Sequence, residues 1–503
     1  MQTLVKKVVI VGGGTAGWMA AASLAHQLAH LNLQITLVES SDIGTVGVGE
    51  ATVPAIRDYI ASLGLDIFDV MRATQGTAKL GIEYVGWSSE GQRFFHPFAA
   101  YGVPAGQTAF HHMWHRLREL GDDAPMAAYN LCTQLALSGR FMLPPPKPRA
   151  AFEAYDWAIH FDAGLFGRYL RKFATQHGVR RIDAKVLGVE VKADGHIENV
   201  RLDSGLLLEG DLFIDCSGFR GLLIQGALRS GYQSWKQWLP CDRAVALPCG
   251  FAPSASADAM TPYTRATALA AGWSWRIPLQ HRIGNGYVYS SDHVSDDGAE
   301  AVLRTRVEGE ILADANRLRF TSGHATEMWK GNCVALGLAA GFLEPLESTS
   351  IVLVQTGIEK LIRLFPQAGF NSVIRDEFNR STRLEYERIR DFLILHYWAS
   401  GRPEPMWRAC QMAELPEPLR HKIDVFRAHG HLVRYEWESF QDPSWLSMYA
   451  GFGISATCRD PSADRVEFAQ LLDIAKRLRI DITAIAGQAK SHASFVESQL
   501  TVR

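Results

Sequence analysis

The sequence VVIVGGGTAG, from Val8 to Gly17, decides the fold of this 503-residue chain. Its four β-branched residues predict a short buried strand. Gly12, Gly14 and Gly17 then follow with the spacing G-x-G-x-x-G, and the residues after them carry apolar side chains at helical spacing. A strand, a glycine turn and a helix in this order predict an α/β fold that binds a dinucleotide.

Each glycine in this turn has a separate physical task. Gly12 permits the tight turn, Gly14 lets the backbone approach a diphosphate, and Gly17 allows the helix to pack closely on the strand. A second predicted strand, LQITLVE, ends on Glu39, about 20 residues after Gly17, where an acidic side chain can accept a hydrogen bond from a ribose hydroxyl. The residues expected to bind the nucleotide here are Gly12, Gly13, Gly14, Thr15, Ala16, Gly17 and Glu39.

Two distant segments favour FAD over NAD as the nucleotide. LEGDLFIDCSGFRG places an apolar strand before Asp215, and GNCVALGLAAGFLEPLESTSI places a strand at Cys333–Leu336 before a helix start. In both segments the chain would come back to the nucleotide. A simple nicotinamide-binding domain does not need such additional segments, whereas the binding of an extended FAD molecule does. Taken singly, either segment also fits an ordinary strand and turn.

Composition excludes several other classes of protein. The chain is 47% hydrophobic and 21% charged, with a formal net charge of -2, which gives no electrostatic case for nucleic acid or an anionic membrane. The seven cysteines include no C-x-x-C pair, and no uninterrupted apolar run is long enough to span a membrane. We therefore expect a cytoplasmic protein with no membrane span, as a monomer or homodimer. Residues 1–400 are expected to form an FAD-binding domain from separated segments, and residues 401–503 a mainly helical region packed on it.

Several motifs together resemble the flavin-dependent halogenases of the tryptophan halogenase type. The resemblance runs from Val8 to about Trp407 and rests on GWSWRIP (272–278), VGVGEATVP (46–54), TAKLGIEY (77–84), AAGFLEPLEST (339–349) and HFDAGLFGRYL (160–170). It implies an α/β fold with an FAD-binding domain of the Rossmann-like, flavin monooxygenase type and a mainly helical substrate-side region.

The resemblance also implies an activity and two catalytic residues. Reduced FAD (FADH2), supplied by a separate flavin reductase, would use oxygen and a chloride or bromide ion to make hypohalous acid. A tunnel would lead this oxidant to Lys79, which would hold it by a hydrogen bond or as a haloamine. Glu347 would orient the halogen and help take the proton from the arene. Without the resemblance, Lys79 would be interpreted as a solvated surface lysine and Glu347 as an acid in the first turn of a helix.

The same resemblance assigns further cofactor and halide residues. Additional FAD contacts are expected at Val48, Gly49, Ala51, Val189, Leu338 and Ile351. The halide is expected on backbone N–H groups of Thr349 and Ser350, at a predicted helix start that suits anions. Ser350 departs from the family pattern, which has glycine there.

Aromatic residues are expected on both sides of the proposed tunnel. Trp273 and Trp275 share one face of an extended segment and would form an apolar wall near the flavin; the alternative is an ordinary core strand. His96 and Phe98 match a His-x-Phe pair that flanks the substrate ring, and Phe440 or Trp445 would supply a second stacking ring. The family's polar clamp for free tryptophan has no match here. The expected substrate is therefore an electron-rich arene such as indole, an indole derivative or another aromatic, with free tryptophan as an alternative.

Two other functions stay open at this point. An aromatic hydroxylase of the same flavoprotein fold would not need Lys79, and a non-catalytic FAD-binding redox module would make no halogenated product. The cluster FHHMWH, with His111, His112 and His115, matches no strong metal motif and is interpreted as structural, so no metal site is expected.

Overall fold

The computed structural model describes residues 4–44, 49–104, 106–145, 155–252, 259–367 and 369–500. The chain forms two compact units, each assembled from three separated segments. The first unit comprises Met1–Gly76, Phe161–Lys236 and Leu318–Glu387, and the second comprises Thr77–His160, Gln237–Arg317 and Arg388–Arg503. The domain division expected at residue 400 stays a prediction.

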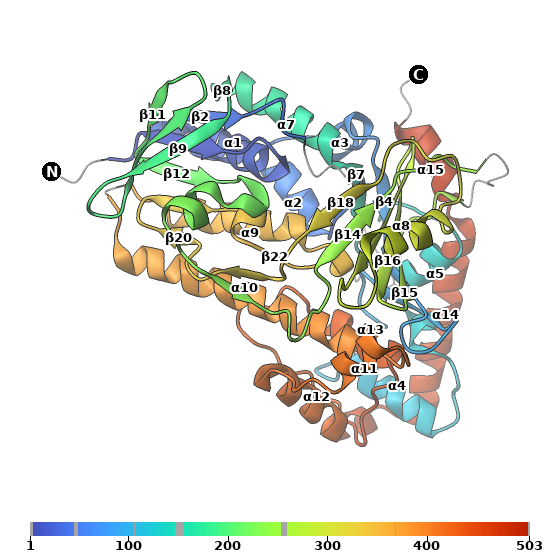
Figure 1. Ribbon diagram of the computed structural model, residues 1–503. Helices are drawn as coiled ribbons and strands as arrows, with labels where there is room; N and C mark the ends of the chain where they lie inside the picture. The colour runs from blue at the N-terminus through green and yellow to red at the C-terminus, as the bar shows by residue number, and fades with distance from the viewer. Residues whose placement is uncertain are drawn as a thin grey trace. The chain divides into compact units, whose positions relative to one another are not determined.

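A six-stranded sheet organises the first unit. Its strands, in spatial order, are β20 (Trp329–Lys330), β21 (Cys333–Ala335), β12 (Leu212–Asp215), β1 (Lys7–Val11), β2 (Gln34–Glu39) and β8 (Arg180–Asp183). All neighbours are parallel except the edge strand β20. Parallel strands need crossover connections, and helix α1 (Thr15–Gln27) provides the one between β1 and β2 (Figure 1). The four strands predicted for nucleotide binding, β21, β12, β1 and β2, are thus neighbours in the sheet.

The sequence of this unit explains its local structure. Val8 to Val11 are all buried in β1, as expected for a strand covered on both faces. The small residues of α1 bury most of that helix, which packs against α7 (Ala163–Gln176) and α9 (Ser350–Arg363). A separate three-stranded sheet contains β9 (Val186–Val191), β10 (Ile197–Leu202) and β11 (Leu207–Glu209).

A second, largely antiparallel sheet organises the second unit. Its adjacent strands are β14 (Arg243–Ala246), β17 (Ile283–Tyr289), β16 (Gly272–Pro278), β15 (Thr264–Leu269), β5 (Gly81–Val85) and β6 (Arg93–Pro97). Among these six strands, β15 and β5 run parallel, and the other neighbouring pairs are antiparallel. Every residue of β16 and β17 is buried, so both faces of the sheet centre are covered.

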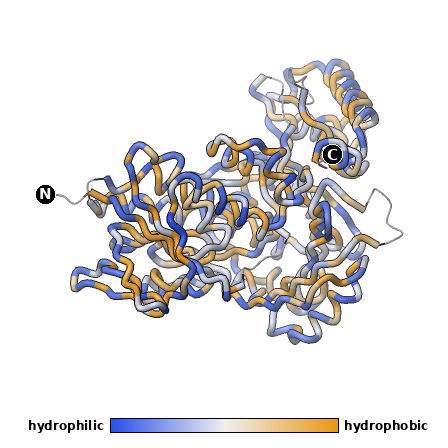
Figure 2. The backbone as a smooth tube through the Cα atoms, turned by 90° about the horizontal axis from the view of Figure 1, so that it is seen from above, coloured by the Kyte–Doolittle hydropathy of each residue, from blue (hydrophilic) through white to orange (hydrophobic). Residues whose placement is uncertain are grey.

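The C-terminal region is helical, as predicted. After α10 (Ser372–Trp398) come α11 (Pro405–Gln411), α12 (Glu417–His429), α13 (Asp442–Gly451), α14 (Phe468–Gln488) and α15 (His492–Leu500). Figure 2 shows hydrophobic and hydrophilic stretches alternating along the chain. Within the described ranges, no helix is both long and apolar enough to cross a membrane.

Candidate active site

The glycine turn of the first unit forms a cradle that side chains would fill. Gly12 has a φ of +112°, and a Cβ there would lie 2.2 Å from the carbonyl oxygen of Cys216. A Cβ on Gly17 would lie 1.9 Å from the Gly12 oxygen. In contrast, a Cβ on Gly14, which caps the N-terminus of α1, would meet no protein atom within 4 Å. This open approach to a helix N-terminus fits a diphosphate group.

Glu39 is held at the end of β2 by two residues that the sequence did not reveal. Arg181, on the neighbouring strand β8, donates from Nε to Oε1 at 2.5 Å, and Trp18 donates from Nε1 to Oε2 at 3.3 Å. The Glu39 carboxylate also crowds Gly13, where a Cβ would lie 1.6 Å from Oε2. The fixed carboxylate suits a ribose hydroxyl. Arg181 lies far along the chain, so no local pattern points to its pairing with Glu39.

The first return of the chain is organised by buried Asp215. Its carboxylate accepts hydrogen bonds from the backbone N–H groups of Ser217, Leu223 and Ile224 and from the Ser217 hydroxyl. Burial raises the pKa of Asp215, and these hydrogen bonds oppose that rise. Asp215 therefore shapes the turn whose Cys216 carbonyl meets Gly12, instead of offering its carboxylate to the nucleotide.

The second return of the chain contains Glu347 and the predicted halide residues. Glu347 ends the short helix η7 (Pro345–Glu347) and is 1% exposed. It lies in the first turn of η7 and precedes α9, which begins at Ser350. Thr349 caps α9 and is buried; among the described residues its Oγ1 has no hydrogen-bond partner. A buried hydroxyl and the N–H groups of a helix start fit an anion or a polar cofactor atom.

The remaining predicted cofactor residues lie in different parts of the first unit. Gly49 and Ala51 belong to β3 (Gly49–Ala51), whereas Val48 lies outside the described residues. Leu338 is in the short helix η6 (Gly337–Ala339), and Ile351 is the second residue of α9. Val189 lies on β9, outside the six-stranded sheet that carries the glycine turn.

Lys79 is fully buried in the second unit. It ends β4 (Thr77–Lys79), its exposed fraction is 0%, and its Nζ lies 5.0 Å from the centre of the Phe98 ring. An ammonium over an aromatic face is a favourable cation–π contact. The structure thus excludes a solvated surface lysine and brings together two residues that the sequence predicted for the site.

Neutral His160 ties the lysine strand to the central sheet. The Thr77 hydroxyl donates to the Pro278 carbonyl at 2.7 Å, so it must accept the hydrogen bond that joins it to His160 Nδ1 at 3.1 Å. The other ring nitrogen, Nε2, then accepts from the Thr264 hydroxyl at 2.9 Å. Burial first, and then the charge of Lys79, lowers the pKa of His160 well below its usual range.

Trp273 and Trp275 share one face of β16, with their ring centres 6.2 Å apart. The Trp275 ring covers Gly286 on the neighbouring strand, where a Cβ would lie 2.0 Å from ring atoms. Within the described ranges, Trp275 Nε1 is buried without a hydrogen-bond partner. The crowded glycine fixes the ring plane, so β16 presents two large, closely packed rings on this face.

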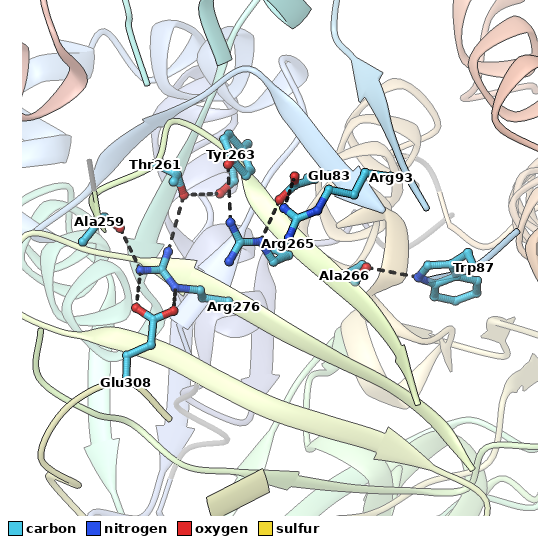
Figure 3. A network of polar contacts seen from close by, with 10 residues as sticks. All are labelled: Glu83, Trp87, Arg93, Ala259, Thr261, Tyr263, Arg265, Ala266, Arg276 and Glu308. Atoms are coloured by element: carbon cyan, nitrogen blue, oxygen red, sulfur yellow. Dashed lines mark hydrogen bonds and ion pairs between the residues drawn. The ribbon is translucent and has the colours of Figure 1, made fainter. Parts of the chain in front are cut away.

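The opposite face of the sheet is held by ion pairs (Figure 3). Arg265 and Arg276 face each other across β15 and β16, an arrangement that is unfavourable for like charges alone. Arg265 pairs with Glu83 at 2.7 Å, and Arg276 binds both carboxylate oxygens of Glu308 at 2.8 and 2.9 Å. These carboxylates compensate the two charges and fix the strand that carries the tryptophans.

An aromatic cluster surrounds the predicted substrate residues. Phe440 stacks on Phe392 at a centroid distance of 4.0 Å, and His96 lies 5.9 Å from Phe392 and 6.3 Å from Phe440. Trp445 meets Phe392 edge-on at 5.0 Å. Sequence reasoning missed Phe392, which lies in the apolar stretch FLILHYW and is indistinguishable there from core residues.

A buried ion pair lies directly behind this cluster. Lys422 Nζ is 4.5 Å from the centre of the Trp445 ring and 2.8 Å from a carboxylate oxygen of Glu438. Burial lowers the pKa of Lys422, whereas Glu438 opposes the change. The charge of Lys422 is therefore compensated within the protein.

The histidines of helix α4 (Phe110–Glu119) bind the backbone of the C-terminal region. His111 Nε2 lies 2.8 Å from the Gly430 carbonyl oxygen, and His112 Nδ1 accepts from the Asp460 N–H at 3.2 Å. Across the described part of the chain, no group of three or more His, Cys, Asp or Glu side chains is placed to hold a metal ion.

Known proteins match this fold along nearly all of its length. The family model described as tryptophan halogenase matches residues 7–467. Among solved structures, the flavin-dependent halogenase BrvH from Brevundimonas sp. BAL3 has 47% sequence identity and a TM-score of 0.94, covering 98% of this chain and 99% of its own. The flavin-dependent halogenase Xcc4156 from Xanthomonas campestris has 41% identity and a TM-score of 0.94, covering 100% and 99%. The 7-chloro-L-tryptophan 6-halogenase KtzR from Kutzneria sp. (strain 744) is 36% identical, over 94% of this chain and 96% of its own.

These matches define the class as a flavin-dependent halogenase. The chain belongs to the tryptophan halogenase family. Membership of this family implies FAD as cofactor, a halide ion, an aromatic substrate and a flavin reductase as partner.

Proposed function

We propose that this enzyme halogenates a neutral, electron-rich arene such as indole, and that Lys79 delivers the halogen. When bound, reduced FAD with oxygen supplies the oxidising power that converts chloride or bromide to hypohalous acid. The reduced FAD comes from a separate flavin reductase. The observation that carries the proposal is the burial of Lys79 against Phe98, because an amine in this position can bind a small oxidant away from bulk water.

The first unit supplies the cofactor and halide sites in this proposal. Gly12, Gly14 and Gly17 accommodate the FAD diphosphate, and Glu39 binds a ribose hydroxyl. The start of α9, with the buried Thr349 hydroxyl, binds the halide next to the cofactor.

Lys79 holds the halogen by a hydrogen bond from its ammonium or, as an amine, by a nitrogen–halogen bond. Glu347 accepts the proton that leaves the ring carbon when the new carbon–halogen bond has formed. Trp273 and Trp275 keep organic molecules away from the oxidant source, so the halide is the nucleophile that reacts there.

The aromatic cluster favours a neutral ring over an amino acid. His96 and Phe440, whose rings both contact the Phe392 ring, offer faces for stacking. Lys422, whose ammonium lies over the Trp445 ring, already pairs with Glu438. To bind Lys422, a substrate carboxylate would have to break that buried ion pair. Breaking a buried ion pair costs several kcal/mol.

The test is a substrate panel with the purified enzyme, FAD, a flavin reductase, oxygen, and chloride or bromide. Mass spectrometry should detect halogenated indole, with kcat/KM for indole exceeding that for tryptophan by about tenfold or more. An oxygenated product without halogen would instead support a hydroxylase. Tryptophan as the better substrate would overturn the neutral-arene assignment alone.

A further inference from the structure

We propose that His492 is a positioning residue for Lys79, which it fixes through the backbone of the preceding residue. The Ala78 N–H donates to His492 Nε2 at 3.1 Å, and His492 Nδ1 donates to the Met260 carbonyl oxygen at 2.7 Å. His492 lies in the C-terminal helix α15, outside the residues 7–467 matched by the family model. This inference rests on the proposed role of Lys79.

The hydrogen bond satisfies a backbone group that the sheet leaves open. Strand β4 pairs on one side with β7 (Ala158–Asp162), where Thr77 faces His160 and Lys79 faces Ala158. In an antiparallel pair, the intervening residue directs its N–H to the opposite side. Ala78 is fully buried, so its N–H needs a partner, and His492 supplies one.

The residue on the other side of Lys79 is fixed to the same segment. The Leu80 N–H donates to the Pro262 carbonyl at 2.8 Å, two residues beyond Met260. The backbone on both sides of Lys79 is therefore attached to residues 260–262, directly at Leu80 and through the imidazole of His492 at Ala78.

Arg276 anchors this segment in turn. Its Nη2 donates to the Ala259 carbonyl at 2.7 Å, and its Nη1 donates to the Thr261 hydroxyl at 3.4 Å, as Figure 3 shows. Arg276 belongs to β16, the strand of Trp273 and Trp275. Hydrogen bonds on either side of the short backbone segment 259–261 thus join the tryptophan strand to the lysine strand through Met260 and His492.

The neighbourhood of His492 makes it a fixed connector. Its exposed fraction is 0%, its own N–H donates to the Gly139 carbonyl at 2.9 Å, and Phe141 N–H donates to the Lys490 carbonyl at 3.2 Å. Both ring nitrogens are used, one as donor and one as acceptor, which defines the neutral tautomer. The imidazole therefore sets the distance between Ala78 and Met260.

The test compares three variants by two measurements. His492→Phe keeps a ring but loses both hydrogen bonds; His492→Gln can restore a donor and an acceptor. Phe495→Leu is the matched control, because Phe495 anchors the same helix by packing on Phe141 at a ring distance of 4.6 Å and its ring, 6.5 Å from that of His492, makes no hydrogen bond. Product formed per reduced FAD oxidised measures halogen delivery, and hydrogen exchange of the peptide around Ala78 measures the hydrogen bond itself.

We expect His492→Phe to lose about tenfold or more of its product yield per flavin oxidised, since small misplacements of reacting groups have effects of this size. Hydrogen exchange at Ala78 should accelerate in the same variant, while the flavin oxidation rate stays within about twofold of the wild type. His492→Gln should recover most of both properties, and Phe495→Leu should lose neither.

Unchanged yield in His492→Phe, or an equal loss in Phe495→Leu, would overturn the positioning role. If hydrogen exchange at Ala78 is unchanged in His492→Phe, the proposed hydrogen bond between Ala78 and His492 is contradicted, whether or not the enzyme is active. If the wild-type enzyme halogenates nothing, the proposed function fails, and the exchange measurement separates that failure from a failure of the His492 contact.

Discussion

The Nζ atom of Lys79 lies 5.0 Å from the centre of the Phe98 ring, on a strand whose three residues are all buried. Lysine side chains are rarely fully buried, because the transfer of an ammonium charge out of water is costly. Two neutral imidazoles hold this strand: His160 donates to the Thr77 hydroxyl, and His492 accepts from the Ala78 backbone N–H. The arrangement holds one amine rigidly against one aromatic face.

The glycine turn offers the first prediction, a comparison of Gly14→Ala with Gly12→Ala. The new methyl group of Gly14→Ala meets no protein atom within 4 Å, so the folded apoprotein should keep its Tm within about 2 °C. FAD affinity should fall about tenfold or more, because the methyl group occupies the approach to the diphosphate. Thermal unfolding and fluorescence titration with FAD check both effects.

Gly12→Ala should behave differently in the same assays. Its methyl group would lie 2.2 Å from the Cys216 oxygen in a backbone conformation with φ of +112°, so the fold itself should lose about 1–3 kcal/mol of stability. Normal FAD affinity in Gly14→Ala would show that the diphosphate does not bind at this helix start.

The second prediction concerns the buried Thr349 hydroxyl at the start of α9. Thr349→Val replaces a buried hydroxyl without a described partner by a methyl group, so the apoprotein should become about 1 kcal/mol more stable. If that hydroxyl helps to bind the halide, the halide KM should rise about tenfold. Urea unfolding and a bromide saturation curve measure the two changes.

Ser350→Ala serves as the control for Thr349→Val, because the neighbouring backbone N–H groups remain and the Ser350 side chain is only partly buried. We expect little change in either measurement. A halide KM that Thr349→Val leaves unchanged would remove the hydroxyl from the halide site.

The strand, turn and helix proposed to bind the nucleotide could be predicted because their signals are local. The strand, turn and helix around Gly12 to Gly17 lie in one short segment, and Glu39 ends the next strand. The motif that contains Lys79 marked that residue as a candidate, although only the structure reveals its burial.

The supporting residues could not be predicted, because their partners are distant in the chain. Arg181 reaches Glu39 only after β8 pairs with β2, and His492 reaches Ala78 only after the C-terminal helix has packed. A single polar residue forms no periodic pattern in the sequence that could point to such a distant partner. The buried Lys422–Glu438 pair could not be predicted from the sequence either, because charged residues are usually expected on the surface.

The third prediction is a pH dependence of stability. Burial lowers the pKa of His492 to about 4, below its usual value of 6.5, so the unfolded chain takes up this proton more readily than the folded protein. The stabilisation is complete above about pH 6.5 and declines as the pH falls toward 4, by at most about 3 kcal/mol. His160, whose pKa is also lowered, acts in the same direction.

His492→Gln removes one of these two titrating groups. The free energy of unfolding, measured by urea at pH values of about 7 and 5, should therefore fall less in His492→Gln than in the wild type. Equal losses in both proteins would show that His492 does not remain neutral in the fold.

The central claim is that the oxidant forms first and that Lys79 then delivers it to the arene. The most direct measurement compares the wild type with Lys79→Met, using indole as substrate and, in parallel, a β-diketone that traps free hypohalous acid. We expect the wild type to give halogenated indole, and Lys79→Met to lose about 100-fold or more of that product while it oxidises reduced FAD and halogenates the trap at near wild-type rates. Halogenation of indole by Lys79→Met at the wild-type rate, with equal FAD oxidation, would contradict the account.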